Sequence, residues 1–401
     1  MISVLKYGGT SLGDTSLIIK VASYLKSRID KGEKLCVVVS AMGSRTNELM
    51  SLASEMIDKP SGRELDRLLS TGENMTISLL ALALESLNIK AKSLTADQIG
   101  IITDCIHNKA RIKDINKDLI LEHFNNYDIL IVAGFQGVTS NNEITTLGRG
   151  GSDTSAVALA SVLKCDCEIY TDVNGIYTTD PRVFPKARKL DYITYEEMSE
   201  MSALGAGVMH NRGINLARNN NVVVYVARAL SKEKGTYIMD GNNIEKNLVT
   251  ALSHEEDVIS VSMLLKNVKN IENEVFKMLT NKGINIDMIS YVIVNECVSL
   301  GFTSNESCLN DIELVISEFS QDILEYKITS NYAKVSLIGS GMRDAVGVVN
   351  KLFEVLAKND IKFYQATTSE ITISILIKKD KLLKSVKAIC SEFMLGEQWK
   401  K

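Results

Sequence analysis

The chain has 401 residues, of which 45% are hydrophobic and 23% are charged, and its formal net charge is −4 at pH 7. These values are typical of a globular protein with two or three domains, and they give no overall signal for nucleic-acid binding. No apolar run reaches the ~18–20 residues of a membrane helix, and the start of the chain lacks the pattern of a signal peptide.

Short apolar runs that fit buried strands alternate with longer segments that have helical spacing. Strands are predicted at 2–7, 34–41, 128–135, 167–173 and 222–227, and helices at 14–28 and 63–87. This alternation favours a mostly parallel sheet that is covered on both faces. Ligands of such sheets bind at the carboxyl ends of the strands, where the glycine-containing turns of this chain lie.

After about residue 255 the pattern changes to a weak internal repeat. Residues 275–290 align with 352–367 at an offset of 77, and Leu279, Ile284 and Val298 fall on Leu356, Ile361 and Ile375. Each copy has the order strand, helix, strand, strand. A repeat of this kind predicts two small α+β units that pack on each other.

The segment KYGGTS (6–11) follows the first strand and precedes a helix. Paired glycines let the backbone approach a ligand, and amides at a helix start favour an anion. Lys6 adds a point charge that suits a phosphate. A plain strand-to-helix turn explains the glycines equally well. The chain contains neither a Walker A sequence nor a G-x-G-x-x-G segment after a strand.

The segment TTLGRGGSDTS (145–155) is a second glycine-rich turn before an apolar helix. Ser152 or Asp153 can cap that helix, which is their structural explanation. Capping does not explain Arg149, whose guanidinium suits bidentate binding of a carboxylate or phosphate.

A third segment, YTDVNGIYTTDPR (170–182), follows another strand. Asn174 and Gly175 predict a hairpin with these residues at its tip. The residues on either side are then free to border a nucleotide, and these are Thr171, Asp172, Tyr177 and Arg182.

Three polar residues stand in apolar surroundings elsewhere. Glu73 lies in the helical segment after Thr71-Gly72, where a carboxylate is costly unless it is paired, for instance with a substrate ammonium. A partly exposed helix-face glutamate is the alternative. Ser40 and Thr46 follow the second strand and can bind an anion or cap a helix.

Together and in this order, KYGGTS, VVSAMG-x-x-T, TGE, GRGGSDTSA and YTDVNGIYTTDPR resemble the aspartokinases of the amino acid kinase family. The resemblance covers essentially the whole chain and is to the monofunctional type. It implies a three-layer α/β/α kinase domain at 1–250, with a mostly parallel sheet, followed by two ferredoxin-like α+β ACT domains at 258–330 and 331–401. It also implies phosphorylation of the L-aspartate β-carboxylate by ATP with Mg²⁺, the first step towards lysine, threonine and methionine.

Carried over by position, the resemblance assigns roles to individual residues. Lys6, Arg149 and Asp153 would serve the chemistry. Aspartate would be held by Ser40, Thr46, Glu73, Arg149 and Ser152. ATP would contact Lys6, Tyr7, Gly8, Gly9, Thr171, Asp172, Tyr177, Arg182, Gly207 and Val208. An end-product amino acid, lysine or threonine, would bind near Met288, Ser290, Ser340, Met342, Thr368, Ser369 and Glu370.

Two features depart from the family pattern. Gly207 in LGAGVMH stands where aspartokinases commonly carry a nucleotide-contacting lysine, and the segment 264–276 lacks the usual D-x-P-G-like loop of the first ACT domain. Of the two alternatives, a non-catalytic amino-acid sensor is favoured by Gly207 alone, and the ACT pair argues against another amino acid kinase.

The remaining expectations concern compartment, metal and partners. The seven cysteines form no C-x-x-C pair and are expected to be reduced thiols in a cytoplasmic protein, and the four histidines are too scattered to predict a metal site. A homodimer or larger homo-oligomer through the ACT domains is expected, without nucleic-acid or membrane partners.

Overall fold

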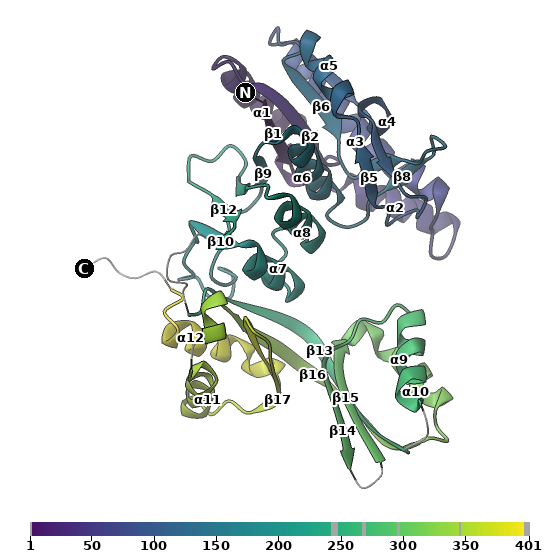
Figure 1. Cartoon of the computed structure of the whole chain (residues 1–401), viewed down its shortest axis with the longest axis vertical. Coiled ribbons are helices and arrows are strands. Elements are labelled where there is room, and N and C mark those ends of the chain that lie inside the picture. The colour runs from purple at the N-terminus through teal and green to yellow at the C-terminus, as the bar shows by residue number, and fades with distance from the viewer. Residues whose placement is uncertain (1, 242–247, 267–269, 295–296, 345, 397–401) are drawn as a thin grey trace, which may run out of the picture. The chain divides into compact units, whose positions relative to one another are not determined.

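The computed structural model describes residues 2–241, 248–266, 270–294, 297–344 and 346–396. The chain forms two compact units, which are treated separately below (Figure 1). The first unit contains Met1–Ile176, Lys189–Ala203 and Gly207–Ile244, and the second contains Tyr177–Arg188, Leu204–Ala206 and Glu245–Lys401.

The first unit is built on an eight-stranded sheet with the order β10-β12-β11-β9-β1-β2-β6-β3. Every neighbouring pair is parallel except β11 and β12, so the predicted mostly parallel sheet is confirmed. Its strands are β1 (Ile2–Tyr7), β2 (Lys34–Val39), β3 (Ala91–Leu94), β6 (Ile129–Ala133), β9 (Cys167–Thr171), β10 (Tyr192–Thr194), β11 (Val224–Arg228) and β12 (Thr236–Met239).

Helices cover both faces of this sheet. Side chains from alternate positions of β1, β2 and β6 form a core with α1 (Thr15–Ile29) and α3 (Arg63–Glu85). The intervening positions, such as Lys6, face α6 (Gly151–Leu163) on the opposite side, since Lys6 contacts Asp153 of that helix. Because strand side chains alternate, neighbouring residues of one strand serve different layers.

The rest of the first unit consists of shorter elements. A four-stranded sheet, β5-β4-β7-β8, was not predicted because its strands have only three or four residues. Its strands are β4 (Ile101–Thr103), β5 (Ile112–Ile115), β7 (Gln136–Val138) and β8 (Ile144–Thr146). The other helical segments are η1 (Gly9–Leu12), α2 (Arg45–Met56), α4 (Ala96–Ile99), α5 (Lys117–Asn126), α7 (Tyr195–Ala203) and α8 (Asn211–Asn220). No described helix of the chain has the length and apolar character that a membrane span requires.

The hairpin predicted at Asn174-Gly175 is wrong. β9 ends at Thr171, and the next strand, β10, begins only at Tyr192. The chain instead runs past the start of β12, where the amide of Ile176 donates to the Thr236 hydroxyl and its carbonyl accepts from the Leu190 amide. An Asn-Gly pair permits a tight turn but does not create the partner strand that a hairpin needs.

The second unit contains a six-stranded antiparallel sheet with the order β14-β15-β13-β16-β18-β17. Each repeat contributes strand, helix, strand and strand, as the sequence predicts, and then a further helix that was not predicted. The first has β13 (Ala251–Lys266), α9 (Ile271–Asn281), β14 (Asp287–Val294), β15 (Cys297–Asn305), η2 (Glu306–Cys308) and α10 (Leu309–Glu318). The second has β16 (Ile323–Ile338), η3 (Ser340–Asp344), α11 (Val348–Lys358), β17 (Phe363–Thr368), β18 (Thr372–Lys378), η4 (Lys379–Lys381) and α12 (Leu382–Glu392).

The two longest strands, β13 of the first repeat and β16 of the second, run side by side (Figure 1), and each contributes side chains to the cores of both repeats. Their pairing shifts register near Asp257, and Asp257 and Asn331 both have left-handed backbone angles there. Near this junction the buried Lys334 ammonium pairs with Glu255 at 2.9 Å and with Asp287 at 2.6 Å. Burial opposes ionisation of the Asp287 carboxyl, but the Lys334 ammonium holds the pKa of that carboxyl below its usual value.

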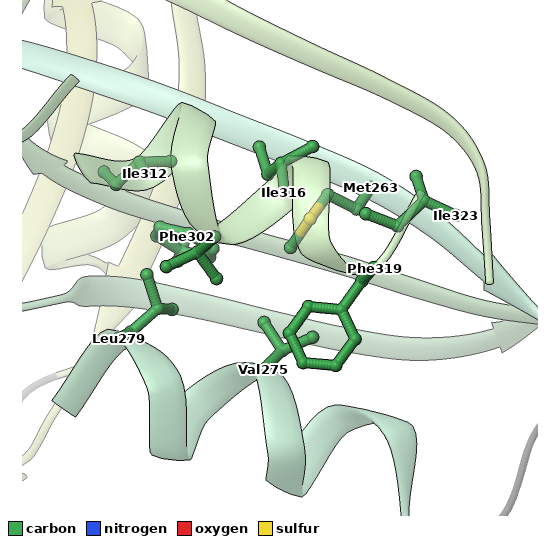
Figure 2. A pocket seen from close by; sticks show the side chains of 9 residues that line it. Met263, Val275, Leu279, Phe302, Ile312, Ile316, Phe319 and Ile323 are labelled. Carbon is green, nitrogen blue, oxygen red and sulfur yellow. The ribbon is translucent and has the colours of Figure 1, made fainter. Parts of the chain in front are cut away.

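Figure 2 shows the interior of the first repeat, where α9 and α10 pack on the sheet. A small gap there is lined by Met263, Val275, Leu279, Phe302, Ile312, Val315, Ile316, Phe319 and Ile323. All nine side chains are apolar, so the gap offers no partner for the charged groups of an amino acid. It is part of the hydrophobic core.

Candidate active site

The predicted site residues of the first unit follow strands that end at the same edge of the sheet. Tyr7 is in register with Val39 of β2 and with Tyr170 of β9. The amide of Gly8 donates to the Tyr170 carbonyl, and the amide of Ser40 donates to the Tyr7 carbonyl. The carboxyl ends of β9, β1 and β2 therefore bring Thr171, Gly8 and Ser40 to neighbouring positions.

Lys6 and Asp153 form an ion pair at this edge. The Lys6 Nζ lies 2.7 Å from Asp153 Oδ1, and both side chains are about nine-tenths buried. Asp153 is in the first turn of α6, whose amides give that end of the helix a partial positive charge. The pair places the Lys6 ammonium beside a helix N-terminus, and this combination attracts a phosphate.

Two glycines allow close backbone approaches around this pair. A Cβ on Gly9 would lie 2.5 Å from the Ala41 carbonyl oxygen, so only glycine fits between η1 and the loop after β2. Gly150 precedes α6 with φ +65°, and a Cβ there would lie 2.2 Å from the His210 Cβ. Both glycines are required by their surroundings, whether or not a ligand binds.

Arg149 and Ser152 lie on either side of this second turn. Arg149 is exposed, and no carboxylate of the described residues lies within ion-pair distance of its guanidinium. Ser152 is buried in α6, against Gly134. Thr46 is half-buried in the first turn of α2. A guanidinium without an ion pair is suited to bind a carboxylate.

Glu73 is the most unusual residue of the site. It lies on α3, is 3% exposed, and its Oε1 accepts a hydrogen bond of 3.0 Å from the Ala41 amide. Its Oε2 is buried and has no hydrogen-bond partner in the described structure. Burial raises the pKa of Glu73 to about 8, although the Ala41 hydrogen bond favours the ionised form. A carboxylate in such a place lacks a positive partner, which a ligand ammonium can supply.

Phe135 is a site residue that the sequence analysis missed. It follows β6 with φ +67°, an unusual backbone angle for a bulky side chain. Its amide donates to the Ser155 hydroxyl of α6, and its carbonyl accepts from the Leu147 amide in the loop that carries Arg149. Strain of this kind concentrates at functional sites. Its one sequence signal was the pair of glycines, Gly134 and Gly137, in AGFQG.

The predicted nucleotide residues are divided between the two units. Thr171 and Asp172 end β9, where the Thr171 hydroxyl donates to the Asp172 carboxylate. Gly207 and Val208 lie between α7 and α8 of the same unit. The Tyr7 side chain, by contrast, faces the α1 side of the sheet, where its ring stacks on Tyr170 at 5.0 Å. Only the backbone of Tyr7 is therefore at the site.

Tyr177 and Arg182 belong to the second unit. Tyr177 packs against the apolar core formed with α11 and α12. Arg182 pairs with Asp180, with 2.7 Å between Nη2 and Oδ2, and its side chain is 90% exposed. The Arg182 hydrogen bonds lower the pKa of the Asp180 carboxyl and outweigh its burial, which opposes ionisation.

The predicted effector residues all lie in the second unit. Met288 is buried on β14 with φ +48°, and its carbonyl accepts a hydrogen bond from the Gln365 side chain of β17. Ser290 is exposed on β14. Ser340 and Met342 follow β16, Thr368 ends β17, and Ser369 and Glu370 lie between β17 and β18. The Gly339 amide donates to the Ile371 carbonyl, which joins these last two segments.

A larger hollow of about 650 Å³ lies elsewhere on the first unit. Its walls come from α1, β9, β11, β12 and the loop before β12, and include Tyr24, Glu168, Tyr170, Tyr225 and Tyr237. None of the predicted site residues lines it. The described residues also contain no group of three or more His, Cys, Asp or Glu side chains that could hold a metal ion by themselves.

Comparison with known proteins gives consistent similarities. The amino acid kinase family model matches residues 1–228, and an ACT domain model matches 335–393. Aspartokinase 2 of Bacillus subtilis (strain 168) is 41% identical over 400 residues, which cover 98% of each chain. The aspartokinase of Geobacillus stearothermophilus is 42% identical over 402 residues, with 99% of this chain and 98% of the relative covered.

A solved structure of an aspartokinase is similar to this chain as well. It is the structure of Escherichia coli aspartokinase III in complex with lysine and aspartate, described as the T-state. It has a TM-score of 0.79 and 25% identity, and the match covers 98% of this chain and 99% of that one.

Proposed function

This chain belongs to the aspartokinases of the amino acid kinase family, and we propose that it transfers the γ-phosphoryl group of ATP to the β-carboxylate of L-aspartate. The products are 4-phospho-L-aspartate and ADP, and the reaction is the first step towards lysine, threonine and methionine. The observation that carries this proposal is the buried Glu73 carboxylate. One of its oxygens has no hydrogen-bond partner in the described structure. The other accepts from the Ala41 amide, which follows β2 at the sheet edge where Lys6 pairs with Asp153.

The chemical problem is the approach of two anions. The nucleophile is already a carboxylate, so no strong base is needed, but the triphosphate repels it. The Lys6 ammonium, the amide of Gly9 and the N-terminus of α6 offset this repulsion and stabilise charge in the transition state. Asp153 orients the Lys6 ammonium through their ion pair.

Aspartate is held by its two charged ends. Arg149 binds a substrate carboxylate with two parallel hydrogen bonds, and Glu73 binds the ammonium. Ser40, Thr46 and Ser152 add hydroxyl groups around the substrate. Positioning of this kind supplies up to about 7–11 kcal/mol in the best intramolecular models.

We propose that the nucleotide contacts the backbone of Tyr7, Gly8 and Gly9, together with Thr171, Asp172, Gly207 and Val208. Tyr177 and Arg182 keep the nucleotide-binding role that the family pattern implies for them. Mg²⁺ is coordinated mainly by phosphate oxygens and needs only one or two carboxylates. The described residues contain no group of three or more His, Cys, Asp or Glu side chains that could hold a metal ion by themselves, and Mg²⁺ that arrives with ATP would neutralise phosphate charge.

We also propose feedback control through the second unit. The E. coli relative binds lysine as well as aspartate, which makes lysine the first effector to test and threonine the next. Met288 and Ser290, and the group formed by Ser340, Met342, Thr368, Ser369 and Glu370, are the proposed contacts. Such a ligand must favour a less active state by binding it more tightly.

The remaining proposals concern domains, assembly and location. We propose ACT domains at 258–330 and 331–401 after a kinase domain at 1–250, and the strand junction at Asp257 and Asn331 supports that division. A homodimer through the ACT domains is part of the proposal. A cytoplasmic location is also proposed, because the reaction consumes ATP.

The test is aspartate-dependent ADP production by Lys6→Ala and Arg149→Ala variants whose circular dichroism shows that they are folded. Each substitution is expected to abolish turnover. Full activity in either variant would contradict its assigned role. Addition of lysine, threonine and diaminopimelate, each separately, to the same assay tests regulation, and no response to any of them would contradict the effector site.

A further inference from the structure

We propose that Asp66 is a positioning residue that fixes the loop carrying Arg149 to the helix carrying Glu73. The inference rests on the substrate-binding roles proposed above for those two residues. Asp66 lies in the first turn of α3 and is completely buried. Nothing in the proposed chemistry uses it directly, so its charge needs another explanation.

The Asp66 carboxylate accepts hydrogen bonds from three residues. The His107 ring contacts Oδ2 through Nδ1 at 2.7 Å, and Asn108 donates through its amide and through its side chain, the latter at 2.6 Å. The Thr146 hydroxyl donates to Oδ1. All these groups act as donors, and a carboxylate, which has only acceptors, matches them.

Thr146 connects this carboxylate to the substrate loop. It is the last residue of β8 and is followed by Leu147, Gly148 and Arg149. The Thr146 carbonyl also accepts from the Ala110 amide. The start of the loop is therefore held at both its side chain and its backbone.

Arg212 of α8 holds the same segments from another direction. Its guanidinium donates to the Leu147 carbonyl at 2.8 Å and to the Ala110 carbonyl at 2.7 Å. A Cβ on Gly148 would lie 2.9 Å from the Asn108 carbonyl oxygen, so the loop passes directly against the segment that Asp66 binds. The buried Asp66 and the half-buried Arg212 thus fix the backbone just before Arg149.

Helix geometry explains why this anchor acts on substrate binding. Asp66 and Glu73 are seven residues apart, which is about two turns, so both project from the same face of α3. Through Asp66, the receptor for the substrate carboxylate is tied to the helix that carries the receptor for its ammonium. A displacement of about 1 Å between such groups can cost on the order of a hundredfold in rate.

The test compares Thr146→Val, which removes only the hydroxyl, with Thr146→Ser, which keeps it. Thr146→Val is expected to raise KM for aspartate on the order of tenfold, since it removes the hydrogen bond through which Thr146 ties the loop to the buried Asp66 carboxylate, while KM for ATP changes less than about twofold. Thr146→Ser is expected to restore most of the aspartate affinity. Asp66→Asn replaces an acceptor oxygen with an NH₂ group, which is a donor that faces other donors. It is expected to raise KM for aspartate more than Thr146→Val does.

Glu64→Gln is the matched control, because Glu64 is an exposed acid in the same helical turn. It is expected to leave both KM values unchanged. Equal increases in the two KM values, or a lower melting temperature with unchanged KM values, would overturn the inference and leave Asp66 with a structural role alone. Arg149→Ala in the same assay separates the proposals. If it loses aspartate binding while Thr146→Val does not, only the positioning role fails; if it binds aspartate normally, the proposed function of the loop fails.

Discussion

At the scale of single residues, the site depends on charges that the fold leaves incompletely paired. Glu73 is buried with one free carboxylate oxygen, and Arg149 is exposed with no ion pair to a described residue. Lys6, by contrast, already has Asp153 as its partner. A zwitterionic substrate supplies the two charges that Glu73 and Arg149 lack, so binding and charge compensation are the same event.

The raised pKa of Glu73 predicts a pH-dependent affinity for aspartate. With a pKa of about 8, the free carboxyl is mostly protonated at pH 6, and only the ionised form attracts an ammonium. KM for aspartate is therefore expected to fall by roughly tenfold or more between pH 6 and pH 8 and to level off above pH 8. Steady-state kinetics at a series of pH values measures this change.

Glu73→Gln is the control for that profile. It keeps the shape of the side chain but does not titrate, so its KM for aspartate is expected to be high and constant over the same pH range. The same slope in the variant and in the wild type would show that another group is responsible.

Gly207 permits a test of the departure from the family pattern. A Cβ at this position meets no atom within 4 Å, and its φ is not in the left-handed region, so a longer side chain fits. Gly207→Lys is expected to lower KM for ATP by roughly threefold, the effect of an exposed ion pair. Gly207→Gln, which is long but neutral, is not expected to lower it. An equal effect of both side chains would contradict a role for the charge.

At the scale of elements, the turn into α6 determines the site. Gly148, Gly150 and Phe135 all have positive φ angles, and the hydrogen bonds of Phe135 join the end of β6 to both the loop and the helix. Arg149, the start of α6 and Asp153, the partner of Lys6, consequently lie along one short stretch of backbone. The glycines that look like a phosphate-binding pattern are also needed for packing.

Gly150→Ala is expected to destabilise this turn for two reasons. The new Cβ would lie 2.2 Å from the His210 Cβ, and the residue has φ +65°. Gly32→Ala isolates the second reason, because Gly32 has φ +84° but no atom within 4 Å of a Cβ. In urea unfolding, Gly32→Ala is expected to cost about 1–2 kcal/mol, and Gly150→Ala is expected to cost more and to raise KM for aspartate. Equal losses in both variants would show that His210 moves without cost.

At the scale of the whole molecule, the second unit leaves a sheet edge open. β14 pairs only with β15 among the described strands and exposes Ile289, Tyr291, Val292 and Ile293. Exposed apolar edge strands associate with other chains unless they are protected. This edge is therefore our expected contact for the proposed homodimer.

Ile293→Lys is expected to shift the protein from dimer to monomer in analytical ultracentrifugation, because it places a charge in that edge. Leu383→Lys is the control, since Leu383 is similarly exposed but lies on α12 of the same unit. An unchanged mass for Ile293→Lys, or an equal loss of dimer in both variants, would contradict a contact through β14.

The sequence by itself determined the family, the alternation of strands and helices and the repeat in the second unit. Periodicity and short motifs are local properties, and Leu279 with Leu356 and Val298 with Ile375 are buried at matching positions. The comparisons confirm the family. Periodicity did not detect the four-stranded sheet, because strands of three or four residues are too short to show it.

Only the tertiary structure decided how the individual site residues are used. Neighbouring residues of one strand point to opposite faces, so Lys6 meets Asp153 while Tyr7 stacks on Tyr170. The Ala41 amide that contacts Glu73, the left-handed Phe135 and the partners of Asp66 come from segments far apart in the chain. Burial and pairing of charges arise from packing between such segments, and no local pattern records them.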